Sequence, residues 1–84
     1  MIKKSVTIRL AQGLEARPIA MLVQTATKFS SSVYFEMEEK KVNAKSIMGM
    51  MSLRLLNGDS ITVAAEGEDE QTAIQEMEKF LSGR

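Results

Sequence analysis

The segment at residues 42–53 reads VNAKSIMGMMSL. Ser46 directly precedes residues that can turn helically, and a serine at that position caps a helix because its hydroxyl accepts a hydrogen bond from a backbone N–H two or three residues later. The helix that follows is roughly two turns long. Its isoleucine and methionines cannot all be buried, so some should face solvent. The segment alone leaves two interpretations open: a modifiable serine beside an apolar docking patch, or an ordinary capped helix whose methionines fill the core.

The chain before this segment predicts a strand, a helix and a hairpin. Apolar and polar residues alternate from Ile2 to Leu10, as in a half-buried strand. A helix then begins at Ala16 or Arg17, and Ser30, Ser31 and Ser32 end it as a polar break. Its apolar stripe consists of Ile19, Leu22, Val23, Ala26 and Phe29. A strand from Val33 to Glu38, a turn near residues 38–40 and a short return through Lys41 and Val42 form a hairpin that leads to Ser46.

The chain after the segment predicts a turn, a last strand and a last helix. Asn57-Gly58-Asp59 is a strong turn signal, and an alternating strand with Ile61, Val63 and Ala65 on one face follows it. We expect Asp69 to cap a final helix with an apolar face of Ala73, Ile74, Met77, Phe80 and Leu81. The order β-α-β-β-α-β-α predicts a single α+β domain over residues 1–84, in which one sheet carries the helices on one face.

Composition and charge exclude several classes of function. The 11 basic and 11 acidic residues give a net charge of zero, so the chain lacks a general electrostatic footprint for nucleic acid. The absence of cysteine excludes disulfide and thiol chemistry. The absence of histidine removes the commonest metal ligand and the commonest acid–base group near neutral pH, so we predict no metal, no cofactor and no enzyme activity. With no apolar run of membrane-spanning length and no signal peptide, we predict no membrane association and a cytoplasmic location.

A second motif, GLEARP at residues 13–18, places a proline at the first turn of the first helix, where its missing N–H costs nothing. Together with KSIMG at residues 45–49, it resembles the phosphocarrier HPr family of the bacterial phosphotransferase system. GLxARP matches the active-site loop of that family, and KSIMG matches its regulatory serine segment. The resemblance covers most of the 84 residues. It implies an open-faced β-sandwich with a four-stranded antiparallel sheet, strand order 1-4-2-3, and three helices on one face.

The resemblance places Glu15 at the position of the family's phosphorylated histidine. Arg17 and Pro18 are retained, so an anion would still be favoured there, but a phosphate donor tuned to imidazole should not transfer to a carboxylate. We therefore expect no phosphate transfer through Glu15. Three interpretations remain open for Glu15: a drifted solvated residue, a charge that favours the helix start, or an imitation of the phosphorylated histidine.

The same resemblance makes Ser46 a phosphorylation site of the ATP-dependent HPr kinase/phosphorylase. Phosphorylation adds close to two negative charges at a helix N-cap, and Lys45 is expected to offset part of that charge. Periodicity allows two buried stripes here, Ile47, Met50 and Leu53 or Met48, Met51 and Leu55. The family pattern favours Met50 and Leu53 inside. The implied partner-binding residues are Arg17, Ala20, Met21, Gln24, Lys45, Ile47, Met48 and Met51.

A serine site without the histidine implies the regulatory branch of the family, which acts in carbon catabolite repression. The phosphorylated protein would bind the catabolite control protein, a LacI-type repressor, as a corepressor, and DNA contact would belong to that partner. One alternative is a sugar phosphocarrier, which the missing histidine opposes. Another is a phosphorylation-independent domain that binds a metabolic enzyme.

The strand order has a consequence for self-association. The N-terminal strand is an edge strand in the order 1-4-2-3, and exchange of a terminal element needs few new contacts. A homodimer formed by exchange of this strand is therefore an open alternative to a monomer.

Overall fold

A computed structural model describes residues 1–10 and 16–83, and for residues 16 and 17 the backbone alone. Its elements are β1 (Ile2–Thr7), α1 (Ala16–Thr27), β2 (Ser32–Met37), β3 (Lys40–Asn43), α2 (Ile47–Met51), β4 (Ser60–Glu66) and α3 (Glu70–Leu81). This order confirms the predicted one. Within the described ranges, no helix is long and apolar enough to cross a membrane.

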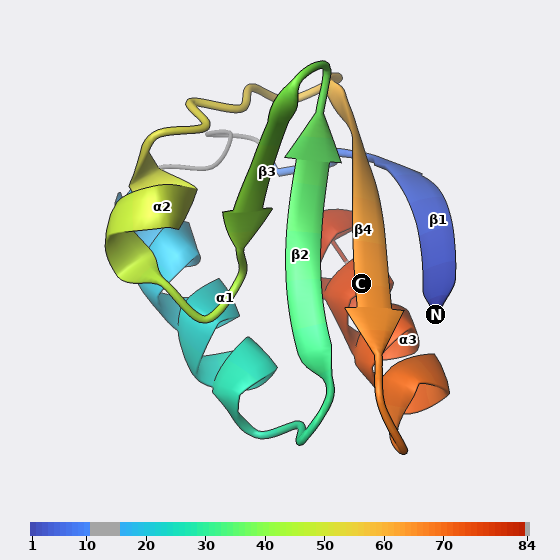
Figure 1. Cartoon of the computed structure of the whole chain (residues 1–84). Coiled ribbons are helices and arrows are strands. Elements are labelled where there is room, and N and C mark those ends of the chain that lie inside the picture. Colours follow the sequence, from blue (N-terminus) through green and yellow to red (C-terminus); the bar gives the residue numbers. More distant parts are fainter. Residues whose placement is uncertain (11–15, 84) are drawn as a thin grey trace.

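The four strands form one antiparallel sheet in the order β1-β4-β2-β3, which confirms the predicted topology. Figure 1 shows α1 and α3 behind the sheet and α2 beside β3. α2 packs against both α1 and β3. A sheet with one apolar face must bury that face, and the two long helices cover it.

The core lies between the sheet and these helices, and the predicted stripes meet there. Its members include Val33 and Phe35 of β2, Ile61, Val63 and Ala65 of β4, Ile19, Leu22, Val23 and Ala26 of α1, and Ala73, Ile74, Met77 and Leu81 of α3. Phe29 and Phe80 are only partly buried against this core. Ala64 is fully buried although it lies on the opposite sheet face, where Lys3 and Tyr34 flank it in register.

The first strand is shorter than predicted, because β1 ends at Thr7 and not at Leu10. Ile8 still exchanges backbone hydrogen bonds with the turn before β4: its N–H donates to Asp59 O at 2.7 Å, and its carbonyl accepts from Gly58 N at 2.8 Å. The Arg9 N–H then donates to the carbonyl of Leu81, at the end of α3, at 2.7 Å. The chain leaves the sheet there because α3 provides the next acceptor.

The predicted cap by Asp69 is wrong. Asp69 stands at the N-cap position of α3, but its side chain makes no hydrogen bond to the helix. One carboxylate oxygen accepts from Ser30 N at 3.0 Å, and the other accepts from Ser31 N at 2.9 Å and from the Ser31 hydroxyl. The helix start is instead supported by Glu70, whose Oε1 accepts from Gly67 N at 3.1 Å. Asp69 therefore fastens the turn between α1 and β2 to the start of α3.

These bonds predict how stability depends on pH. The hydrogen bond from the Ser31 hydroxyl is the main cause that lowers the pKa of Asp69; burial opposes it, and the Ser30 and Ser31 N–H groups add to it. Since the pKa is lower in the folded state, the ionised carboxylate stabilises the fold above the unfolded value of about 3.9. That contribution is lost as the pH falls through the folded-state value. We expect Asp69→Asn to lower the Tm at neutral pH, and the difference to shrink in acid.

Thermal unfolding followed by circular dichroism, from neutral pH down to pH values below the pKa of Asp69, measures the Tm difference between Asp69→Asn and the parent protein. The exposed neighbour Glu68 provides the control, and Glu68→Gln should leave the Tm unchanged at neutral pH. A Tm difference for Asp69→Asn that is independent of pH would contradict the assigned role of the charge.

A glycine is required at position 67 because the backbone there passes close to Ser31, in the turn between α1 and β2. A Cβ at Gly67, whose φ is +152°, would stand 2.7 Å from the Cα of Ser31, whereas a Cβ at Gly58, with φ +96°, would meet no described residue within 4 Å. We expect Gly67→Ala to reduce the free energy of unfolding by about 3 kcal/mol and Gly58→Ala by about 1 kcal/mol, because only the first adds a collision to backbone strain. Urea titration measures both, and equal losses would refute the collision.

Candidate functional site

Ser46 is exposed and caps α2, as predicted. Its backbone is extended, with φ −107° and ψ 113°, and its hydroxyl oxygen accepts a hydrogen bond from Gly49 N at 3.2 Å. Its carbonyl accepts the first helical bond, from Met50 N at 3.0 Å. The hydroxyl thus lies in solvent at the start of α2, with a backbone N–H directed at it.

The chain leading to Ser46 is held by the last residue of β3 and the residue after it. The Asn43 side-chain oxygen accepts from Lys45 N at 2.8 Å, and the Asn43 carbonyl accepts from Ser46 N at 3.0 Å. Ala44 is fully buried, and its N–H donates to the Val33 carbonyl at 2.8 Å. An asparagine that binds the backbone two residues later makes a compact turn. This turn sets the direction in which the chain enters α2.

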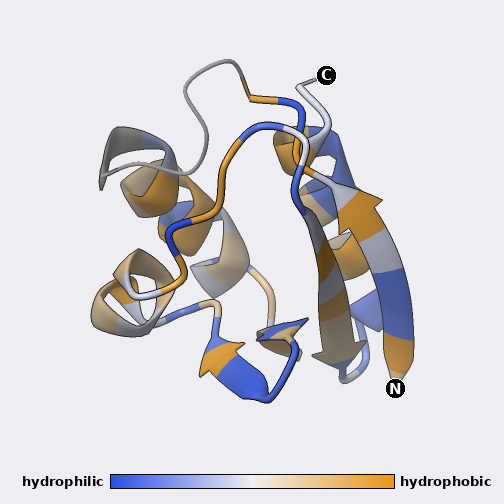
Figure 2. Cartoon of the chain, turned by 90° about the horizontal axis from the view of Figure 1, so that it is seen from above, coloured by the Kyte–Doolittle hydropathy of each residue, from blue (hydrophilic) through white to orange (hydrophobic). Residues whose placement is uncertain are grey.

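α2 has a buried side and an exposed side. Met50 and Leu53 are buried, at 0% and 4% exposure. Ile47, Met48 and Met51 are exposed, at 49%, 84% and 50%, and we call these three residues the α2 patch. Figure 2 shows α2 in hydrophobic colours near the hydrophilic turn between β2 and β3. Neither periodic stripe is buried in full, because Ile47 of the first is exposed and Met48 and Met51 of the second are exposed, although Leu55 is buried. The arrangement matches the one that the family pattern favoured.

Two lysines brace α2, and neither role was predicted. Lys45 Nζ donates to the Phe29 carbonyl at 2.8 Å, just beyond the end of α1, where carbonyls lack helical partners. Lys40 Nζ donates to the carbonyl of Ser52, at the end of α2, at 3.2 Å. Lys45 was expected to offset charge at Ser46, but the structure places its ammonium on Phe29. Sequence spacing could not reveal these pairs, since each acceptor is a backbone carbonyl on another element.

The implied partner residues of α1 lie on a helix that packs against α2. Met21 and Gln24 are exposed, and Ala20 is half-buried. The side chain of Arg17 lies outside the described part of the chain, as does the whole of Glu15. Among the described residues, no group of three or more His, Cys, Asp or Glu side chains could hold a metal ion. The geometry presents an exposed hydroxyl beside an apolar surface.

Comparison with known proteins places this chain in a family. The family profile described as PTS HPr component phosphorylation site matches residues 2–83. The HPr-like protein Crh of Bacillus subtilis is 48% identical over 81 residues, which cover 96% of this chain and 95% of that protein.

Solved structures agree with the match. The phosphocarrier protein HPr from Bacillus anthracis has a TM-score of 0.92 and 41% identity, and the likeness covers 95% of each chain. A crystal structure of Bacillus subtilis Crh, described as an intertwined dimer with a swapping domain, has a TM-score of 0.79 and 47% identity over 99% of this chain and 95% of that one. The two sequence motifs, the strand order and these matches together show that the chain belongs to the HPr family.

Proposed function

We propose that this protein is a regulatory member of the HPr family in carbon catabolite repression. HPr kinase/phosphorylase modifies Ser46, and the phosphorylated form binds a LacI-type catabolite control protein as its corepressor. The observation that carries the proposal is an exposed N-cap serine directly followed by the α2 patch. The similarity to Crh over nearly the whole chain supports the same role.

The local geometry suits phosphorylation without refolding. The Ser46 backbone bonds to Asn43 and Met50 do not involve the hydroxyl. The hydroxyl oxygen accepts one bond, from Gly49 N, and a phosphate ester keeps an oxygen acceptor at that place. Phosphorylation adds close to two negative charges at pH 7. The modification therefore changes the charge of the surface and leaves α2 in position.

The cation that recognises the phosphate would come from the partner. Lys45, the neighbour in sequence, already donates to the Phe29 carbonyl and is half-buried. An arginine or lysine of the partner would pair with the phosphate while its apolar side chains cover the α2 patch, a combination of a charged contact and adaptable methionines that suits a binding switch. Gln24 and Met21 on α1 would extend the same surface.

The lack of histidine separates this role from sugar phosphotransfer. The chain contains no histidine, so it cannot form the phosphohistidine that a phosphocarrier of this family would use. We propose no enzyme activity, cofactor or direct DNA contact for it, and its net charge of zero agrees with leaving DNA to the partner. The proposed partners act in the cytoplasm, and we place the protein there. A domain that binds a metabolic enzyme without phosphorylation is the alternative, and its binding would survive Ser46→Ala.

We also propose that the protein forms a homodimer by exchange of β1. In the part of the chain that the structure describes, β1 lies at the edge of the sheet and pairs only with β4. In an exchanged dimer β1 of each copy would make the same pairing with β4 of the other. The swapping domain of the similar Crh dimer supports this arrangement.

The kinase site can be tested by intact-mass spectrometry after incubation with HPr kinase/phosphorylase and ATP. We expect the mass of one added phosphate, because Ser46 is exposed at an N-cap, and no addition in Ser46→Ala. Ser52, at the other end of α2, provides the matched control: it is also exposed, but its hydroxyl donates to the Gly49 carbonyl at 2.6 Å. Ser52→Ala should still gain the phosphate.

Incubation with enzyme I and phosphoenolpyruvate completes this experiment. We expect no phosphate from that donor. Transfer from enzyme I would show that Glu15 can replace the histidine, and an unmodified chain in the kinase reaction would remove the proposed switch.

The α2 patch can be tested by its contribution to partner binding. Met48 is 84% exposed, so Met48→Ala should leave the Tm unchanged. We expect it to weaken binding of the Ser46-phosphorylated protein to the catabolite control protein about tenfold, the usual effect of truncating an apolar anchor at an interface. Leu56 is 66% exposed and outside α2, so Leu56→Ala is the control and should bind normally. Calorimetric titration measures the affinity of each variant, and equal affinities would rule out a contribution of the α2 patch to binding.

A further inference from the structure

Ion pairs in this protein gather on one element. The structure gives three within the described residues, and each joins the N-terminal segment to the rest of the molecule: the ammonium of Met1 with Glu70 at 3.6 Å, Lys3 with Glu36 at 3.3 Å and Lys4 with Glu78 at 2.9 Å. The carboxylates come from β2 and α3. The edge strand is therefore basic, and the site that receives it is acidic.

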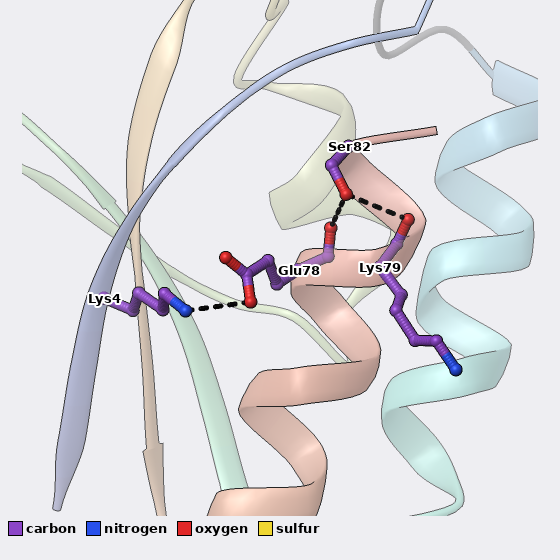
Figure 3. Close-up of polar contacts among 4 residues, drawn as sticks. All are labelled: Lys4, Glu78, Lys79 and Ser82. Atoms are coloured by element: carbon purple, nitrogen blue, oxygen red, sulfur yellow. Dashed lines mark hydrogen bonds and ion pairs between the residues drawn. The ribbon is translucent and has the colours of Figure 1, made fainter. Parts of the chain in front are cut away.

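Lys3 and Lys4 hold β1 from opposite faces of the sheet. Lys3 belongs to the face away from the helices, and its side chain crosses β4 to reach Glu36 on β2. Lys4 belongs to the other face and reaches Glu78 on α3, as Figure 3 shows. Successive side chains of a strand point to opposite faces, so two adjacent lysines can form ion pairs on both faces of the sheet.

Glu78 is held in place by the end of α3. The Ser82 hydroxyl donates to the carbonyl of Glu78 at 2.7 Å and to that of Lys79 at 3.4 Å, and both bonds appear in Figure 3. The Ser82 N–H also donates to the Glu78 carbonyl at 2.9 Å. These bonds hold the backbone that carries the Glu78 side chain in the last turn of α3.

Apolar burial contributes little to the first half of β1. Val6 is the buried residue of this strand, Ile2 is half-buried, and Lys3, Lys4 and Ser5 are exposed. Backbone pairing with β4 is the same for any strand sequence. The charges of Lys3 and Lys4 are therefore the main feature by which the rest of the fold can distinguish this N-terminal strand from another strand.

We propose that Glu36 and Glu78 form an acidic rim that selects the N-terminal strand of a second copy of this chain through Lys3 and Lys4. This inference rests on the homodimer proposed above. During exchange each rim loses its own lysines and regains the same two from the other copy. The rim thus decides which strand is accepted, and because both partners of each ion pair are partly exposed, salt weakens the selection.

A pair of charge-reversal variants tests this selection. Lys4→Glu places two carboxylates together within its own chain, and Glu78→Lys places two ammonium groups together. In an exchanged heterodimer of the two variants, the two substituted side chains would face each other at one site and the unchanged Lys4 and Glu78 at the other, so both sites pair opposite charges. In an equal mixture we expect the ratio of heterodimers to homodimers to be roughly fivefold above its statistical value at low salt, and near that value at about 1 M salt. One variant carries a heavy-nitrogen label, so that native mass spectrometry resolves the two homodimers and the heterodimer by mass.

Glu76 provides the matched control, because it lies on α3 two residues from Glu78 and the structure gives it no ion pair with β1 among the described residues. Glu76→Lys mixed with Lys4→Glu should give the statistical share of heterodimers. Hydrogen exchange of the β1 amides adds a second measurement, and we expect faster exchange in Lys4→Glu than in Glu76→Lys.

The outcomes separate the two proposals. Dimers of the parent protein together with an excess of the charge-matched heterodimer support the rim. Dimers in statistical proportions overturn the rim and leave the homodimer standing. A parent protein that stays monomeric at all concentrations overturns the homodimer, and with it the selection of a second copy's strand.

Discussion

The burial of Met50 is the contact on which the site depends. α2 has only five residues, and a helix that short is not stable alone in water. It exists because Met50 and Leu53 enter the core, because Lys45 just before it binds the Phe29 carbonyl, and because Lys40 binds the Ser52 carbonyl at its end. These contacts leave the α2 patch no room in the core. The exposed apolar surface is thus a consequence of how α2 is held.

The sheet order places two surfaces, which make different kinds of contact, at opposite edges of the sheet. β1 and β3 lie at opposite edges, and α2 packs beside β3. Contacts at α2 are apolar and adaptable, and the proposed phosphate on Ser46 would add one switchable charge, which suits a regulated partner. Contacts at β1 are backbone pairing and ion pairs, which suit a strand of defined charge. Phosphorylation at one edge and strand exchange at the other would therefore involve different parts of the molecule.

The places where sequence interpretation failed share a cause. Asp69 has the residue type and position of a helix cap, yet its carboxylate accepts hydrogen bonds from Ser30 and Ser31, which precede it by 38 residues or more. Lys45 is adjacent to Ser46 in sequence, yet its ammonium donates a hydrogen bond to the Phe29 carbonyl, just beyond the end of α1. Local rules assume that a polar side chain meets its nearest free partner. In a folded chain, buried or unpaired backbone groups of distant segments compete for the same side chain.

The sequence by itself determined the elements, their order, the core stripes of the long helices, the cap at Ser46 and the family, because these follow from periodicity, local hydrogen bonding and two motifs at fixed spacing. Periodicity left open which apolar residues around α2 are buried, since two stripes fit a helix of this length equally well; the family resemblance favoured Met50 and Leu53, and the tertiary structure decided it. Only the tertiary structure decided the partners of Asp69 and of the lysines at positions 3, 4, 40 and 45. Such contacts join residues far apart in sequence, and their geometry exists only once the sheet and helices have packed.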